Sequence, residues 1–314
     1  MKIFIKPRLP YFIIISVIFV ILPFIIGEGW SSLLVEIFIM AIAASAANLM
    51  AGYTGMVSFG VAGFYGAGAY ITALLITKTG LPFVVGFLAG PVGAAVLALP
   101  VGWFCVRRTA IYFSMLSLAF SQLMYVIVYT WYDFTGGDDG IVGIEMPAFL
   151  NSPTSYYYFA LTIMVICLVV MWVILHSPFG KTIQAMRENP ERTDFIGINV
   201  KIYQHAVFII SSFFLGVAGS LYCGFNRNVF ADYISWHKTF EITIVYLLGG
   251  VYNFFGPTAG AIIYIFSNKL IIKYTEYWPI TLGGIVILIT LFIPEGVAGF
   301  LGRYFSQMKS DKKV

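Results

Sequence analysis

The chain has 314 residues, of which 60% are hydrophobic and 10% are charged, and its net charge is +4. Soluble domains are about 45–50% apolar and roughly 25% charged, so a soluble globule of this length is excluded. A disordered chain is excluded as well, because it needs low hydrophobicity and many charges. The sequence therefore predicts an all-α polytopic membrane protein that forms one transmembrane domain over residues 1–314.

Ten segments are apolar over about the 20 residues that a spanning helix needs. They cover about 11–27, 31–51, 57–77, 81–105, 111–132, 155–175, 204–225, 238–252, 257–273 and 278–298. Lys2, Lys6 and Arg8 precede the first segment, as in a signal peptide. No small-residue cleavage site follows before the next segment, so we expect an uncleaved helix.

The distribution of basic residues predicts the orientation. If both termini are cytoplasmic, 13 of the 18 Lys and Arg residues lie on the inner side, as the positive-inside rule requires. The remaining five fall on the outer side, at Lys78, Arg227, Lys238, Lys269 and Lys273. The longest outer loop, about 133–154, carries acidic residues and no Lys or Arg.

Five spans in each half would give the halves opposite orientations, which is the inverted repeat of many transporters. The half-repeats are about 11–132 and 155–298. A short echo supports them, since Gly90-Pro91 is expected to open the fourth span and Gly256-Pro257 the ninth.

No arrangement of residues indicates an enzyme. His176, His205 and His237 stand at predicted span ends, far apart in the sequence, and Cys105, Cys167 and Cys223 form no metal-binding or disulfide pattern. The tripeptide at 180–182, GKT, lacks the earlier glycine and the strand of a P-loop. We therefore expect no catalytic residue, no metal and no cofactor bound by this chain. Only Glu36 and Glu241 place an ionisable group inside predicted spans, both in the outer third.

Residues 52–70 read GYTGMVSFGVAGFYGAGAY, and small residues at this density allow helices to pack closely. Glycines and hydroxyls at the start of a span also favour an unwound segment, which is tolerated at membrane depth only against protein or a water-filled cavity. We expect a translocation pathway along this stretch and its second-half counterpart, with pure packing as the alternative. The candidate residues are Gly52, Gly55, Ser58, Gly60, Gly249 and Gly250.

The cytoplasmic loop at 176–204 has mixed charges and is long enough for a short helix on the membrane surface. We expect it to bind a cytoplasmic partner, with Ile183, Met186 and Phe195 as apolar anchors and Gly197 turning the chain back. The alternative is a solvated connection.

Four ordered motifs reveal a family resemblance. GYTGMVSFGVAGFYGAGAY, RRTAIYFSMLSLAFSQ, TGGDDGIVGI and SPFGKTIQAMRENPERTDFIGINV resemble the LivM-like membrane permease of branched-chain amino acid ABC importers over about residues 35–300. The resemblance implies an ATPase-coupling loop that contains Arg187, Glu188, Asn189, Arg192 and Gly197. Arg192 to Phe195 and Pro190 depart from the small residues usual before that glycine.

The resemblance further implies a bacterial inner-membrane import channel, in which partner subunits hydrolyse ATP and drive alternating access. Its partners would be a sister LivH-like permease, two ABC ATPases and an extracytoplasmic solute-binding protein, within the lipid bilayer and without nucleic acid. Two alternatives stay open at this stage: an ion-coupled secondary transporter of small solutes, and an importer of the same class that carries urea or short amides.

Overall fold

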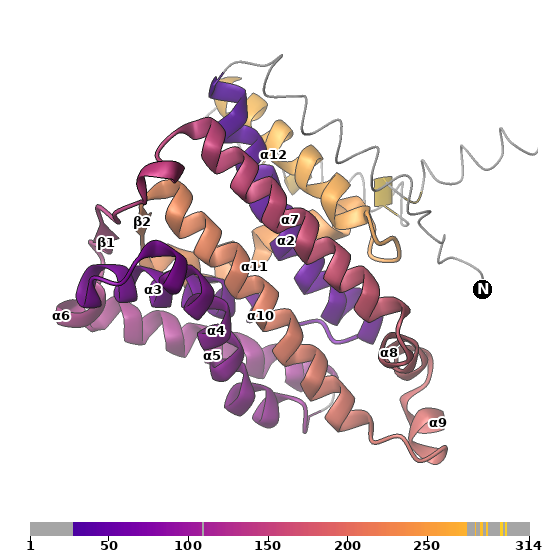
Figure 1. The fold of residues 1–314 in the computed structure, drawn as a ribbon. Helices are drawn as coiled ribbons and strands as arrows, with labels where there is room; N and C mark the ends of the chain where they lie inside the picture. Colours follow the sequence, from indigo (N-terminus) through magenta and orange to yellow (C-terminus); the bar gives the residue numbers. More distant parts are fainter. Residues whose placement is uncertain are drawn as a thin grey trace, which may run out of the picture.

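The computed structural model describes residues 28–108 and 110–274 and a few isolated positions between 280 and 299. The predicted span at 11–27, most of the span at 278–298 and both termini lie outside the described residues. The rest folds into a bundle of helices (Figure 1), numbered as in that figure.

Within the described residues, six helices are long and apolar enough to cross a membrane. They are α2 (Glu28–Thr54), α3 (Val61–Thr79), α4 (Phe83–Cys105), α5 (Ala110–Thr130), α7 (Pro153–His176) and α10 (Val200–Asn226). Each coincides with a predicted span, which confirms the prediction of a helical polytopic membrane protein.

The other elements connect these helices or follow them. They are α6 (Tyr132–Thr135), β1 (Ile141–Val142), η1 (Ala148–Leu150), α8 (Pro178–Glu188), α9 (Pro190–Phe195), β2 (Asn228–Val229), η2 (Ala231–Ile234), α11 (Trp236–Gly249) and α12 (Gly256–Tyr274). β1 and β2 pair antiparallel, with Ile141 opposite Val229. This ribbon lies at one end of the bundle, and α8 and α9 lie at the opposite end (Figure 1).

The two long helices α2 and α10 form the centre. The middle of α2 is rich in alanine and almost wholly buried, since short side chains let neighbouring helices approach closely. α10 packs against α3 and α4, and α2 packs against α7, α11 and α12. Each central helix therefore contacts helices from the other half of the sequence.

One close crossing explains part of the glycine-rich stretch. A Cβ atom on Gly68 of α3 would overlap the backbone of Gly216 in α10. The packing interpretation is therefore correct for this glycine, which holds α3 directly on the central helix.

One expectation about the start of a span and one about the length of a span are wrong. Gly256 does begin α12, but Gly90 is the eighth residue of α4 and Pro91 lies inside that helix. The segment predicted at 238–252 is a 14-residue helix of about 21 Å, shorter than the roughly 30 Å hydrocarbon core. α11 is therefore too short to be the complete span that was expected.

Candidate functional site

The first element of the site is a break in the backbone after α2. The helix ends at Thr54, whose hydroxyl donates to the Leu49 carbonyl at 2.9 Å. Gly55 follows with φ +78°, a left-handed conformation that favours glycine. Residues 55–60 are not helical, and α3 starts only at Val61. The predicted unwound segment is therefore confirmed.

Hydroxyl groups hold this segment in place. The Phe59 N–H donates to Ser117 Oγ of α5 at 3.2 Å, and the Gly60 N–H donates to Ser58 Oγ at 3.2 Å. Ser58 and Gly60 are buried, whereas Gly55 and Val57 are exposed on the surface of the chain. Of the pathway residues predicted here, Gly55 is thus the one that reaches an open face.

A second break precedes α11 and carries the chain into the bundle. After α10 ends, residues 227–235 run inward until Ile234 of η2 packs on Gly66 of α3. α11 then begins beside the start of α3, where the Ala62 N–H donates to Thr239 Oγ1 at 3.2 Å.

The depth of this meeting point follows from the packing of α3 on α10. The ring of Phe64 packs on that of Phe208, with centroids 5.2 Å apart, and Gly68 packs on Gly216. Residues 208–216 are the middle of α10, so the N-termini of α3 and α11 meet in the interior of the bundle.

The two glycine stretches of the sequence meet at the other end of α11. The helix ends at Gly249, and Gly250 has φ +109°. The next carbonyl, of Val251, accepts a hydrogen bond from Asn48 Nδ2 of α2 at 3.2 Å. A Cβ atom on Gly52 would lie 2.6 Å from the same oxygen. Gly52, Gly249 and Gly250 therefore form one joint between α2 and the connection from α11 to α12.

Arg187 of the coupling loop lies on this joint. Its guanidinium stands over the Tyr252 ring, 4.4 Å from the centroid. Its Cγ atom is also the nearest neighbour that a Cβ on Gly55 would meet, at 3.4 Å. One side chain thus contacts both the break after α2 and the connection after α11.

The predicted coupling loop contains two short helices. Ser177 Oγ accepts from the Gly180 N–H at the start of α8, and Asn189 Oδ1 accepts from the Arg192 N–H at 2.8 Å at the start of α9. Pro190 is the first residue of α9, a position where its missing N–H costs nothing. Pro190 and Arg192 to Phe195, which depart from the family pattern, therefore belong to a helix with a regular start.

Two of the three apolar anchors expected in this loop are wrong. Ile183 and Met186 are fully buried within this chain, where they fix α8 to the bundle. Phe195 is 88% exposed, and the adjacent Ile196, which the sequence reasoning missed, is 71% exposed. Phe195 and Ile196 form an apolar tip, which the charged residues Glu191, Arg192 and Asp194 flank. Glu188 is exposed, and Gly197 turns the chain after the tip with φ +88°.

Both intramembrane carboxylates noted in the sequence have a lysine partner. Lys238 Nζ lies 2.7 Å from Glu241 Oε2 on α11, and Lys269 Nζ lies 3.4 Å from Glu36 Oε1 between α12 and α2. Lys238, one of the five basic residues expected on the outer side, has a side chain that is 15% exposed and lies among α3, α10 and α11.

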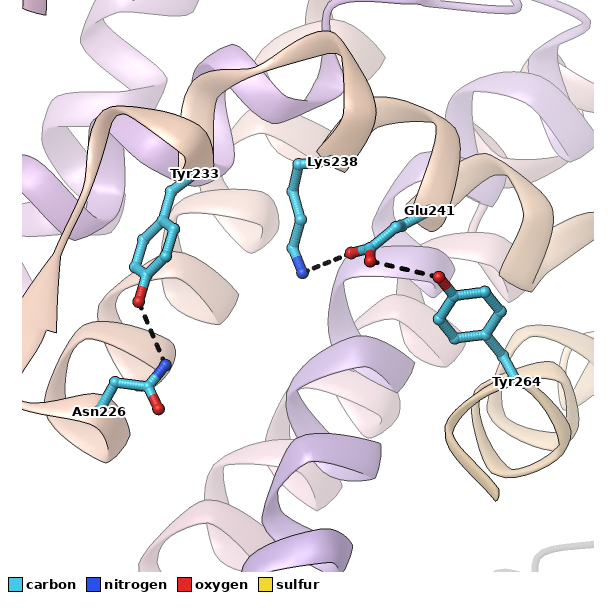
Figure 2. Close-up of polar contacts among 5 residues, drawn as sticks. All are labelled: Asn226, Tyr233, Lys238, Glu241 and Tyr264. Atoms are coloured by element: carbon cyan, nitrogen blue, oxygen red, sulfur yellow. Dashed lines mark hydrogen bonds and ion pairs between the residues drawn. The ribbon is translucent and has the colours of Figure 1, made fainter. Parts of the chain in front are cut away.

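Three tyrosines contact the first ion pair, and Figure 2 shows one of them, Tyr264, beside Glu241. Tyr264 of α12 donates to the other Glu241 oxygen, Oε1, at 3.2 Å. The Lys238 ammonium lies over the rings of Tyr222 and Tyr65, 5.1 and 5.6 Å from their centroids. Next to them, Asn226 Nδ2 donates to the Tyr233 hydroxyl at 3.2 Å. The interior of the described bundle thus holds a compact polar cluster.

Two of the histidines noted in the sequence have backbone partners. His205 Nε2 lies 3.0 Å from the Leu99 carbonyl, and His176 Nδ1 lies 2.8 Å from the Trp172 carbonyl. At the end of the bundle that carries β1 and β2, the Tyr132 hydroxyl donates to Asp139 Oδ2 at 2.5 Å. This hydrogen bond raises the pKa of the Tyr132 phenol. Among the described residues, no group of three His, Cys, Asp or Glu side chains could hold a metal ion.

Comparison with known proteins decides the family. The family model for the permease component of the branched-chain amino acid transport system matches residues 29–293. The chain belongs to this family.

Individual relatives agree with the family match. The permease is 24% identical to the high-affinity branched-chain amino acid transport permease LivM of Escherichia coli, over 91% of this chain and 74% of that protein. It is 26% identical to a probable LivM of Methanocaldococcus jannaschii, over 74% and 69%. A more distant relative, 22% identical over 55% of this chain and 53% of that protein, is the autoinducer 2 import permease LsrC of Photorhabdus laumondii. No solved structure matches the permease.

Proposed function

We propose that this permease is the membrane subunit of an ATP-driven importer of branched-chain amino acids in the bacterial inner membrane. The observation that carries the proposal is the coupling loop. Its apolar tip, Phe195 and Ile196, is exposed to a partner, while α8 behind it is fixed by Ile183 and Met186. A force on the tip therefore reaches Arg187, which contacts the joint.

Two partner ATPases would bind the tip, because large exposed apolar side chains in a polar rim are typical of binding hot spots. ATP would be hydrolysed only by these subunits. The joint of Gly52, Gly249 and Gly250 would then transmit the movement to α2, α11 and α12 and produce alternating access.

A sister LivH-like permease would cover the face that carries residues 55–60 and α11. Gly55 is exposed there outside any helix, and Glu241 is 30% exposed at its edge. Neither feature is tolerated against lipid, so this face needs protein or a water-filled path beside it. A solute delivered by an extracytoplasmic binding protein would move along that path.

The cross-packing of the central helices supports two inverted halves, and the distribution of Lys and Arg supports cytoplasmic termini. α2 and α10 each have 27 residues, and each packs on helices of the other half. A pseudo-two-fold axis in the membrane plane would relate such elements.

The test is uptake by the complete complex in proteoliposomes, with labelled leucine and labelled urea as the two solutes. We expect leucine uptake that requires ATP and the binding protein and persists without an ion gradient. Uptake of urea alone would favour the amide-importing alternative, and uptake driven by a proton or sodium gradient without ATP would favour a secondary transporter.

A further inference from the structure

The ion pair inside the bundle has no role in the coupling path described above. Lys238 and Glu241 lie one helical turn apart on α11. A buried ion pair is weak evidence for stability, because well-packed apolar residues often serve as well or better. Ionisable groups at membrane depth more often serve transport.

We propose that Lys238 and Glu241 form a contact site for a zwitterionic solute, namely the ammonium and carboxylate groups of a free amino acid. The inference rests on the proposed import function and adds the residues that bind the charged groups of the solute.

Both side chains keep unused bonding capacity. An ionised carboxylate accepts about four hydrogen bonds, whereas Glu241 receives one from Lys238 and one from Tyr264. An ammonium has three donors, and Lys238 donates one of them to Glu241. The pair can therefore bind a solute ammonium at Glu241 and a solute carboxylate at Lys238.

The surroundings favour a carboxylate at the Lys238 side. Lys238 is the third residue of α11, and no side chain caps this helix start among the described residues. The positive end of the helix adds to the lysine charge there. Half-helices that begin inside transporters place their N-termini at anionic solute groups.

The exposure of Glu241 and the opposite charges of the pair fit a zwitterionic solute. Glu241 is 30% exposed and lies on α11 next to Phe240, which packs on Phe59 of the unwound segment. A solute would reach the carboxylate first, because Glu241 is twice as exposed as Lys238. A solute with a single charge would engage only one member of the pair, so the pair favours zwitterions over anions and cations.

The experiment uses the complete complex in proteoliposomes and measures leucine uptake beside ATP hydrolysis. Lys238→Met and Glu241→Gln should each lower uptake at least about tenfold, since a charge-assisted contact is lost. Lys269→Met is the matched control, because it breaks the other lysine–glutamate pair. It should keep uptake within about twofold.

A charge-swapped double variant separates solute contact from structural pairing. Lys238→Glu combined with Glu241→Lys restores an ion pair but puts a carboxylate at the positive helix end. We expect this variant to assemble with its partners, measured by co-purification, while uptake stays low. Uptake restored to the wild-type rate would overturn the proposal.

Photolabelling decides the matter if the variants do not assemble. A diazirine analogue of leucine, bound by the wild-type complex during turnover, should label peptides from 236–249, and leucine should compete with it. Labelling confined to other helices would overturn the inference. If the wild-type complex takes up no leucine in any arm, the proposed function itself fails, which is a distinct result.

Discussion

The break at Gly55 allows a sharp test of whether the joint transmits movement. Gly55 has φ +78° and ends α2 against Arg187. In Gly55→Ala, the left-handed conformation costs about 1–2 kcal/mol. The added Cβ meets its nearest atom, Arg187 Cγ, at 3.4 Å, an ordinary contact, so the cost is almost entirely backbone strain. An alanine relieves this strain by extending α2, which would push residues 56–60 away from Arg187.

Gly80→Ala is the matched control. Gly80 caps α3 with φ +66°, and a Cβ there meets no atom within 4 Å. Both variants should therefore lose the same stability, about 1–2 kcal/mol, and their melting temperatures should fall by about the same few degrees. Only Gly55→Ala should lower leucine uptake per ATP hydrolysed in proteoliposomes. Equal uptake by the two variants would show that the break at Gly55 only ends a helix.

Three further predictions concern orientation and the coupling loop. In a cysteine-free background, Asp139→Cys should react with an impermeant thiol reagent added outside intact cells and Arg192→Cys should not; reaction of both would refute the orientation. Gly197→Val should keep ATP hydrolysis but uncouple it from uptake, whereas Gly143→Val, at a similar φ of +80°, should not; the ratio of the two rates in one preparation checks this. Phe195→Asp should abolish co-purification of the ATPase subunits, and undiminished recovery would contradict the role of the tip.

The long helices and their order could be predicted from the sequence, because apolar length alone decides whether a segment spans a membrane. The depth of a residue within the bundle could not be predicted in the same way. Hydropathy describes composition, and a half-length helix such as α11 has the same composition as the end of a full span. Lys238 stands at the start of the segment predicted at 238–252, and composition could not show that its side chain lies over the Tyr222 ring inside the bundle.

The segments of the candidate site could be predicted from the sequence, but the contacts between them could not. Gly52 and Gly250 stand out as glycines, but their meeting depends on Asn48, whose amide binds the Val251 carbonyl. Nothing local marks an asparagine in an apolar helix as that partner. In the coupling loop, the three-residue spacing of Ile183 and Met186 does indicate a buried helix face. It cannot show whether the same chain or a partner buries that face.

The exposed tip has a consequence for biogenesis. Phe195 and Ile196 are a pair of bulky apolar side chains in water until something covers them, and burying each is worth about 1.5–3 kcal/mol. A newly inserted chain therefore exposes an apolar patch to which other proteins can bind non-specifically. Glu191, Arg192 and Asp194 act there as gatekeepers, because charges beside an apolar stretch oppose self-association. Overproduction of this chain without its partners should thus yield aggregated protein. Co-expression with the partner subunits should give a more homogeneous preparation.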